Sequence, residues 1–287
     1  MQQLEIVKKL FTEKLGGLYD AAEAESIFLI VLEDIFGYTR KDLLLDKSLI
    51  LPEGKLARLE EIVARLYSGE PVQHIVGRAS FMGLSFKVNS HVLIPRPETE
   101  ELVHLIIQDL KRSHSPQPKV MDVGTGSGCI PIAIKKRVDK ANVYAMDISR
   151  EALEVAKQNA TDNQCSIHWM LADILEWDLV FPVPMQFDII VSNPPYITHT
   201  EQRHMHPNVL QFEPHLALFV EDQAPLLFYE AIASFALAHL AIGGKLYFEI
   251  NRNFGQEVKE LLQKKGFKDV LLKQDLQGAD RMVRASL

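Results

Sequence analysis

The chain has 287 residues, of which 47% are hydrophobic and 24% are charged, and its formal net charge is −7 at pH 7. This composition is typical of a globular protein and excludes a disordered chain, and the acidic balance argues against a protein that holds duplex nucleic acid mainly through its phosphates. Because it contains only two cysteines, Cys129 and Cys165, we expect no disulfide framework or paired-cysteine zinc site, and a reducing, cytoplasmic location.

The first 75 residues are predicted to form a small helical bundle without strands. Asp20 followed by Glu23 is a capping pattern at a helix start, and Gly37 stands where a left-handed helix end is expected. Apolar residues within 56–67 fall on one helical face. Residues 1–75 carry 9 basic and 13 acidic side chains and nothing suited to catalysis, so we interpret them as a packing or partner-docking domain. No segment of the chain reaches the about 20 apolar residues that a membrane-spanning helix needs.

Residues 76–94 change character and are predicted to connect two domains. Leu84, Phe86 and Val88 alternate with polar residues, which is strand periodicity. Gly83 separates them from a second short extended stretch. The pattern predicts a β-hairpin.

From residue 95 to residue 287, strands and helices are predicted to alternate. We expect strands near residues 119–123, 142–147, 166–170, 187–192, 245–250, 268–274 and 280–285, with Gly243 and Gly244 in a turn before the fifth. We expect helices near residues 129–137, 149–162, 225–240 and 256–265. This alternation indicates an α/β domain with a parallel, doubly wound sheet.

A glycine-rich loop follows the first of these strands. It matches neither the Gly-x-Gly-x-x-Gly dinucleotide fingerprint nor a Walker A loop, which argues against an NAD-dependent oxidoreductase. Glycines let a ligand come close to the backbone, so the loop favours a nucleoside with a short charged tail. The loop residues predicted to bind it are Gly124, Thr125, Gly126, Ser127 and Gly128.

Two acids are predicted to complete the nucleoside site. Asp147 ends the second strand, 23 residues beyond Gly124, where an acid can accept hydrogen bonds from both ribose hydroxyls. Asp173 follows the third strand and is predicted to contact the adenine amino group.

The sequence Asn193-Pro194-Pro195-Tyr196 follows an apolar strand. It therefore lies at the carboxyl end of a buried strand, where open α/β sheets bind ligands. Two prolines remove two amide donors, so the backbone presents carbonyls, while Asn193 adds a side-chain carbonyl and Tyr196 a flat ring. This arrangement predicts a site for a planar group that bears an NH2. A rigid turn that merely ends the strand is the alternative.

The glycine loop followed by Asn-Pro-Pro-Tyr resembles the class I methyltransferases that use S-adenosylmethionine to methylate planar nitrogens. Further segments are similar to the HemK/PrmC family, the protein-(glutamine-N5) methyltransferases of peptide chain release factors. These segments are Phe81-Met-Gly-Leu-Ser-Phe-Lys-Val88, Val92-Leu-Ile-Pro-Arg-Pro-Glu-Thr-Glu100, Phe212-Glu-Pro-His-Leu-Ala-Leu218 and Gly278-Ala-Asp-Arg-Met-Val283. The resemblance covers about residues 70–287. One departure, the segment 220–226, stands where many members are glycine-rich, and we interpret it as a loop variant.

The resemblance implies a Rossmann-like methyltransferase domain over residues 95–287, preceded by the connector 76–94 and a substrate-docking domain 1–75. It implies transfer of a methyl group from S-adenosylmethionine to the glutamine of a release factor's Gly-Gly-Gln loop, leaving S-adenosylhomocysteine. Asn193, Pro194 and Tyr196 would be catalytic, Pro195 would join them in binding the substrate, and Asn193 would also contact the cofactor. The segment 95–100 would close over the cofactor.

Two other functions share these motifs. The first is an RNA or DNA methyltransferase acting on an exocyclic amino group, for which the acidic chain offers no evident nucleic-acid-binding module. The second is a non-enzymatic adaptor that binds a nucleoside and docks a translation factor, against which the intact Asn193 and Tyr196 argue. We expect no metal site, since His199, His204 and His206 share one loop without a well-spaced third ligand, and we expect a monomer.

Overall fold

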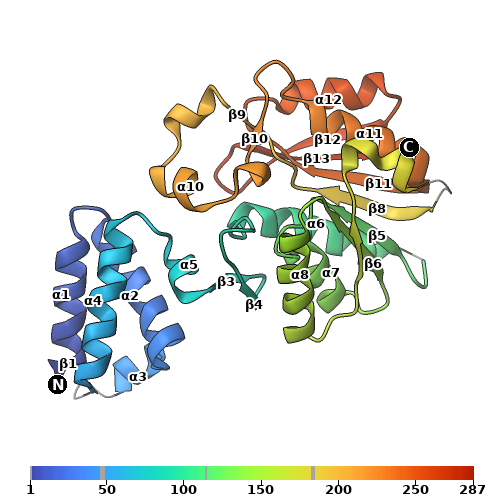
Figure 1. The fold of residues 1–287 in the computed structure, drawn as a ribbon. Helices are drawn as coiled ribbons and strands as arrows, with labels where there is room; N and C mark the ends of the chain where they lie inside the picture. The colour runs from blue at the N-terminus through green and yellow to red at the C-terminus, as the bar shows by residue number, and fades with distance from the viewer. Residues whose placement is uncertain (1, 46–48, 114, 182–184) are drawn as a thin grey trace. The chain divides into compact units, whose positions relative to one another are not determined.

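The computed structural model describes residues 2–45, 49–113, 115–181 and 185–287. The chain forms two compact units (Figure 1). The first, which we call the helical unit, comprises Met1–Arg78 with His206–Phe212, and the second, the sheet unit, comprises Ala79–Met205 with Glu213–Leu287. Over the described residues, no helix is both long and apolar enough to cross a membrane.

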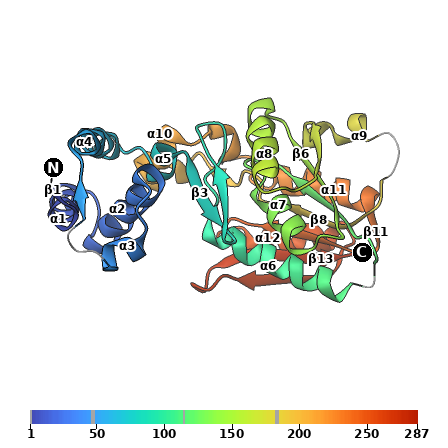
Figure 2. The ribbon, with the colours of Figure 1, turned by 90° about the horizontal axis from the view of Figure 1, so that it is seen from below.

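The helical unit is a bundle closed by an apolar core. Its elements are β1 (Gln2–Gln3), α1 (Leu4–Leu15), α2 (Ala21–Phe36), α3 (Arg40–Leu45), β2 (Ile50–Leu51), α4 (Glu53–Tyr67), α5 (Val72–Val76) and α10 (Pro207–Phe212). Helix α1 packs beside both α2 and α4 (Figure 2), with the rings of Phe11 and Phe28 5.3 Å apart in the core between α1 and α2. As predicted, the Asp20 side chain accepts a hydrogen bond from the Glu23 amide, and Gly37 adopts the left-handed conformation.

The prediction of a bundle without strands is wrong in one detail. β1 and β2 form a two-stranded antiparallel sheet in which Gln2 pairs with Leu51. The Leu51 side chain is buried in the bundle core, which draws the chain alongside the start of α1. There the Leu4 amide donates to the Leu49 carbonyl over 2.8 Å.

The sheet unit contains all the motifs that the sequence singles out as chemical. Its strands are β3 (Arg78–Phe81, whose first residue lies in the helical unit), β4 (Leu84–Lys87), β5 (Lys119–Val123), β6 (Asn142–Asp147), β7 (His168–Leu171), β8 (Phe187–Ser192), β9 (Ile197–Thr198), β10 (Phe219–Val220), β11 (Leu240–Glu249), β12 (Lys268–Gln274) and β13 (Asp280–Ser286). Its α-helices are α6 (Pro97–Arg112), α7 (Cys129–Arg137), α8 (Arg150–Asp162), α9 (Trp177–Val180), α11 (Leu227–His239) and α12 (Gly255–Lys264). Short 3-10 helices span Ile174–Glu176, Glu201–His204 and His215–Ala217.

A seven-stranded sheet with the order β12-β13-β11-β8-β5-β6-β7 runs through the described part of this unit. The strands from β11 to β7 are parallel, as the doubly wound prediction requires. β13 differs, because it lies antiparallel to both β11 and β12. It follows β12 through a tight turn, with Gly278 at a φ of +83°, and a short connection can join only antiparallel neighbours.

Each face of the sheet is covered by helices. Figure 1 shows α6, α7 and α8 on one side and α11 and α12 on the other. Along β8, Ile189 and Val191 enter the core on the α6–α7 side, while Ile190 enters the core formed with α11 and α12. This alternation explains why β8 can carry three consecutive apolar residues, at positions 189–191.

The predicted hairpin is present as β3 and β4, and its turn residues Met82 and Gly83 both have positive φ, +52° and +73°. The buried Asn159 of α8 fastens the hairpin, since its amide exchanges hydrogen bonds with the Lys87 backbone at 2.7 and 3.0 Å. Other elements depart from the predictions. Helix α6, which begins at Pro97, was not predicted, and neither were β9, β10, α9 and α10. Gly243 and Gly244, predicted to form a turn, lie within β11, which already begins at Leu240 and has a register shift before Lys245.

Candidate active site

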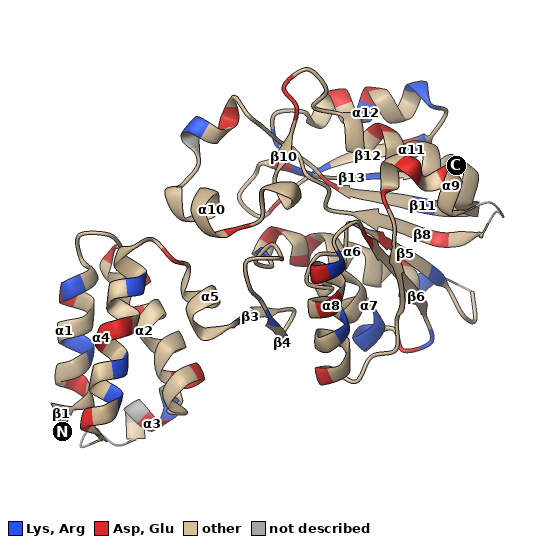
Figure 3. Ribbon diagram, in the orientation of Figure 1, with Lys and Arg blue, Asp and Glu red and all other residues tan. Residues whose placement is uncertain are grey.

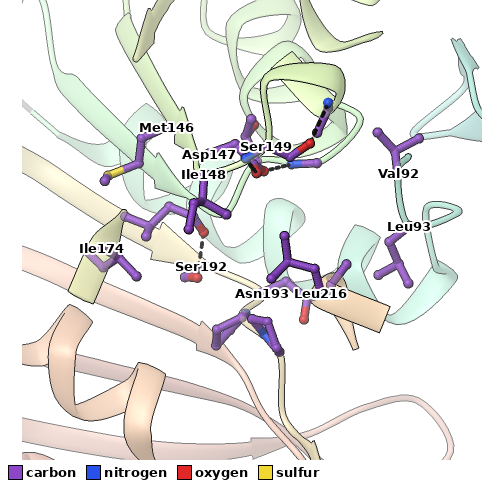
Figure 4. Close-up of a pocket in the computed structure, with 18 of the residues that line it drawn as sticks. Val92, Leu93, Met146, Asp147, Ile148, Ser149, Ile174, Ser192, Asn193 and Leu216 are labelled. Carbon is purple, nitrogen blue, oxygen red and sulfur yellow. Dashed lines mark hydrogen bonds between the residues drawn. The ribbon is translucent and has the colours of Figure 1, made fainter. Parts of the chain in front are cut away.

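A cavity of about 430 Å³ lies at the carboxyl ends of β5, β6 and β8. Figure 4 shows four of the lining residues: Asp147, which ends β6, Ser149 shortly after it, Ser192, which ends β8, and Asn193 directly after it. The Ser192 hydroxyl donates to the Val123 carbonyl over 2.7 Å, which joins β8 to β5 beside the cavity. The glycine loop and the Asn-Pro-Pro segment therefore face one space.

The tip of the glycine loop leaves room for a ligand. Gly124 and Gly126 have φ of +72° and +53°, and a Cβ added to either would meet nothing within 4 Å. The Gly126 amide donates to Asp147 Oδ2 over 2.8 Å, and the Gly124 amide donates to the Met146 carbonyl over 2.9 Å. The open loop is thus held against the end of β6, and its shape fits a cofactor that lies along the backbone.

Both predicted acids line the cavity. Asp147 accepts from Gly126 through Oδ2 and from the Ser149 amide through Oδ1 at 2.9 Å. Burial raises the pKa of Asp147, although these amide donors act against the shift. Asp173 caps a 3-10 helix by accepting from the Leu175 amide over 2.8 Å. Each carboxylate oxygen has further lone pairs with which to accept a ligand hydroxyl or amino group.

Thr125 and Ser127 also line the cavity, whereas Gly128 is absent from its lining. A Cβ on Gly128 would lie 3.0 Å from the Ala156 side chain, so this glycine lets α7 and α8 pack closely. The Ser127 carbonyl accepts a hydrogen bond from Asn159 over 2.9 Å. Asn159, which the sequence interpretation did not single out, therefore holds the glycine loop from behind.

Two buried polar groups beneath the loop have no hydrogen-bond partner among the described residues. They are the carboxyl group of Asp122 and the hydroxyl of Thr125. Burial raises the pKa of Asp122 to about 7. The nearby Thr125 hydroxyl acts against this shift, and the negative charge of Asp147 acts with it. Such groups are uncommon in protein interiors. Thr125 lines the cavity and its hydroxyl is available to a polar ligand, whereas Asp122 does not line it.

Asn193, Pro194 and Pro195 line the cavity as predicted. The Asn193 Nδ2 donates to Thr99 Oγ1 over 3.3 Å. Among the described residues, no donor reaches Asn193 Oδ1 or the Pro194 carbonyl. The end of β8 therefore offers two unused acceptors, which can receive the two hydrogens of an amide NH2 group.

Tyr196 is placed differently from the prediction of a ring facing the substrate. It does not line the cavity; its ring packs against the core shared with α11. Its hydroxyl donates to Glu249 Oε1 over 3.2 Å, and its carbonyl accepts from Asn251 Nδ2 over 3.0 Å. Burial raises the pKa of Tyr196 well above its usual value, and the charge of Glu249 adds to that effect.

The segment 95–100 does reach the cavity, through Pro95, Arg96 and Thr99. Arg96 pairs with the buried Glu213 at 2.5 Å, and Glu213 also accepts from the Ile94 amide over 3.1 Å. This ion pair joins two of the segments that carry the family resemblance. Sequence spacing gave no sign of it, because the two partners lie 117 positions apart.

The histidine loop and the divergent segment 220–226 lie just beyond Tyr196. His199 stacks on Phe219 with ring centroids 5.4 Å apart, His206 is exposed, and the side chain of His204 is outside those described. No group of three or more His, Cys, Asp and Glu side chains in the described ranges is arranged to hold a metal ion. Asp222, in the divergent segment, accepts hydrogen bonds from both the amide and the hydroxyl of Thr200 at 2.9 Å. These two bonds connect the segment to the loop that follows Tyr196.

Comparison with known proteins agrees with this architecture. The methyltransferase small domain family matches residues 100–211, and the PrmC N-terminal domain family matches residues 11–77. A solved methyltransferase from Pyrococcus furiosus, 18% identical, aligns with a TM-score of 0.51 over 79% of this chain and 98% of its own. At that identity, the likeness supports the fold alone.

Two relatives are much closer in sequence. The release factor glutamine methyltransferase of Flavobacterium psychrophilum is 45% identical over 277 residues, which cover 96% of both chains. That of Bacteroides thetaiotaomicron is 40% identical over 274 residues, again covering 96% of both. The chain therefore belongs to the release factor glutamine methyltransferase family.

Proposed function

We propose that this protein transfers a methyl group from S-adenosylmethionine to the side-chain amide nitrogen of the glutamine in the Gly-Gly-Gln loop of peptide chain release factors. The observation that carries the proposal is the pair of unused acceptors, Asn193 Oδ1 and the Pro194 carbonyl, in the same cavity as Asp147 and the open glycine loop. S-adenosylhomocysteine is the second product.

The residues present fit the cofactor. Gly124 and Gly126 leave open space beside the backbone, Asp147 would accept hydrogen bonds from the ribose hydroxyls, and Asp173 would contact the adenine amino group. Thr125 and Ser127 complete the loop. When bound, S-adenosylmethionine supplies an electrophilic methyl group on a sulfonium centre.

The chain's own contribution to the chemistry is orientation and electrostatics. An amide nitrogen is a poor nucleophile, so fixing it in line with the methyl group is the main requirement. Positive charge develops on this nitrogen as the new carbon–nitrogen bond forms, and the nitrogen then loses one proton to solvent. Asn193 Oδ1 and the Pro194 carbonyl, as preorganised acceptors, would stabilise that charge. Pro195 would stiffen the loop, and Tyr196 would anchor it from behind.

We further propose that residues 1–75 dock the release factor and that residues 76–94 connect them to the catalytic domain 95–287. One glutamine side chain offers little surface for recognition, and α1 and α4 carry interspersed acidic and basic residues (Figure 3), which suits a protein partner better than a phosphate backbone. Protection of amides in α1, α2 and α4 from hydrogen exchange on addition of a release factor would support docking there. Unchanged exchange would refute it.

We infer a monomer that acts in the cytoplasm without direct contact with nucleic acid. The low cysteine content, two residues in the whole chain, suits a reducing compartment.

Mass spectrometry of a purified release factor tests the proposal. After incubation with the protein and S-adenosylmethionine, we expect a gain of one methyl group on the glutamine of the Gly-Gly-Gln loop. A release factor with that glutamine replaced by alanine is the matched substrate control, and RNA and DNA oligonucleotides test the nucleic-acid alternative. Methylation of the nucleic acid with an unmodified release factor would refute the proposal.

A further inference from the structure

A chain of hydrogen bonds runs from Asn193 away from the cavity to a buried carboxyl group. Asn193 Nδ2 donates to Thr99 Oγ1 over 3.3 Å, and the Thr99 hydroxyl donates to Glu249 Oε2 over 2.6 Å. Thr99 and Glu249 are only 2% and 1% exposed. Three elements, α6, β8 and β11, therefore meet behind the predicted acceptor.

The direction of this chain fixes the Asn193 amide. A hydroxyl carries one proton, and that of Thr99 is directed at Glu249. Thr99 Oγ1 can then only accept, so the Asn193 side chain must turn its NH2 group toward it. The opposite orientation would bring two oxygen acceptors together without a proton between them. Asn193 Oδ1 is consequently turned away from Thr99 and left free of described donors.

Glu249 is itself held from the other end of the Asn-Pro-Pro-Tyr segment. Its Oε1 accepts from the hydroxyl of Tyr196, the last residue of the segment, over 3.2 Å. The same carboxyl group accepts from Thr99, which contacts Asn193, the first residue of the segment. Burial raises the pKa of Glu249, while these two hydroxyls and the positive charge of Arg281 oppose the shift. Arg281 is in turn held by Asp275 at 3.2 Å.

We propose that Thr99 and Glu249 are positioning residues, which orient the Asn193 amide so that its oxygen meets the substrate nitrogen. The inference rests on the proposed function, because it concerns the group that receives the amide. Loss of the Thr99 hydroxyl should slow the methyl-transfer step. Without it, the Asn193 side chain can rotate, and its oxygen is no longer held where positive charge develops on the substrate nitrogen.

Thr99→Val tests the proposal, because valine keeps the shape of threonine and lacks the hydroxyl. We expect kcat for release-factor methylation to fall about 10- to 100-fold, in the range that small misplacements of reacting groups produce. KM for the release factor and the dissociation constant of S-adenosylmethionine should each change less than about threefold, which corresponds to less than about 1 kcal/mol of binding free energy. Thr99→Ser, which restores a hydroxyl, should recover most of kcat. Glu249→Gln should lower kcat in the same direction.

Two comparisons separate positioning from simple loss of structure. Tyr247→Phe removes another buried hydroxyl on β11, one that is bonded to Asp109, and we expect kcat to be unchanged. If Thr99 acts through Asn193, adding Thr99→Val to Asn193→Ala should lower kcat no further, because residues that act as a unit are not additive.

The possible outcomes are distinct. A wild-type kcat in Thr99→Val, a loss that Thr99→Ser does not reverse, or a loss that adds fully to that of Asn193→Ala would overturn the positioning role. An equal loss of kcat and cofactor affinity in Thr99→Val would overturn it as well. If the wild-type protein leaves the Gly-Gly-Gln glutamine unmodified while still binding S-adenosylmethionine, it is the proposed function that fails.

Discussion

The backbone amide of Gly126 donates to Asp147 Oδ2 over 2.8 Å. This bond fastens the tip of the glycine loop to the end of β6, so the loop and the acid form one surface of the cavity. The same carboxylate accepts from the Ser149 amide at the start of α8. Asp147 therefore shapes the loop as well as presenting oxygens to a ligand.

Asp147→Ala should weaken binding of S-adenosylmethionine, because two ribose hydroxyls would lose a charged acceptor. A hydrogen bond to a charged group contributes about 1.5–3 kcal/mol, so we expect affinity to fall roughly 10- to 150-fold. Calorimetric titration measures this directly. Asp188→Ala is the matched control, since Asp188 also accepts from a backbone amide, that of Lys119 at 2.7 Å, but does not line the cavity. Equal affinities for the Asp147 variant and the wild type would exclude the ribose assignment.

Asn193→Ala should leave cofactor binding nearly intact and slow methyl transfer. Loss of one preorganised electrostatic contact typically costs about 10²–10³ in kcat. Single-turnover transfer to a Gly-Gly-Gln protein at saturating cofactor is the measurement. Turnover within a few-fold of the wild type would mean that the acceptor role of Asn193 is wrong and that the segment is only a turn.

Gly126→Ala should mainly weaken cofactor binding and Gly128→Ala should mainly lower folding stability, although both positions have a left-handed φ. At Gly128 a methyl group would press on Ala156 at 3.0 Å, so we expect a loss of unfolding free energy of about 1–3 kcal/mol from overpacking, beyond the strain common to both. At Gly126 the methyl group would enter open space and compete with the cofactor. Denaturant unfolding and calorimetric titration of both variants check this; the same profile for both would contradict the assignment of Gly128 to packing.

Asp122→Asn should make stability less dependent on pH. Burial raises the pKa of Asp122 from 3.8 to about 7, so between these values the folded state binds more protons than the unfolded state. The unfolding free energy of the wild type therefore falls as pH rises from about 4 to about 7. A shift of about three units corresponds to a penalty on the order of 4 kcal/mol above pH 7.

The amide that Asp122→Asn introduces cannot ionise, so the stability of this variant relative to the wild type should rise with pH. Urea unfolding of both proteins at about pH 5 and about pH 8, on either side of the pKa of Asp122, gives the comparison. A difference in unfolding free energy that stays constant across this interval would show that Asp122 does not titrate there.

Features encoded by neighbouring residues could be predicted from the sequence. Asp20 and Gly37 mark the ends of α2 because capping involves residues a few positions apart. The apolar run of β8 placed Asn193 at the carboxyl end of a buried strand, and the cavity opens there. Helix α6 was missed although its signal was present: Pro97 begins it, and buried Leu102, Val103, Ile106, Ile107 and Leu110 follow at helical spacing.

The sequence by itself determined the alternation of strands and helices in the sheet unit, the glycine loop and the acceptor-rich segment, because each depends on adjacent residues and their local conformational preferences. Only the tertiary structure decided which distant groups meet there. Thr99 and Glu249 are 150 positions apart, and their contact depends on how α6 packs on the sheet and on where β11 ends. The inward anchoring of Tyr196 and the antiparallel insertion of β13 have the same origin. Strand pairing and burial bring together parts of the chain that are distant in sequence, and the residues around each part do not indicate which other part it will contact.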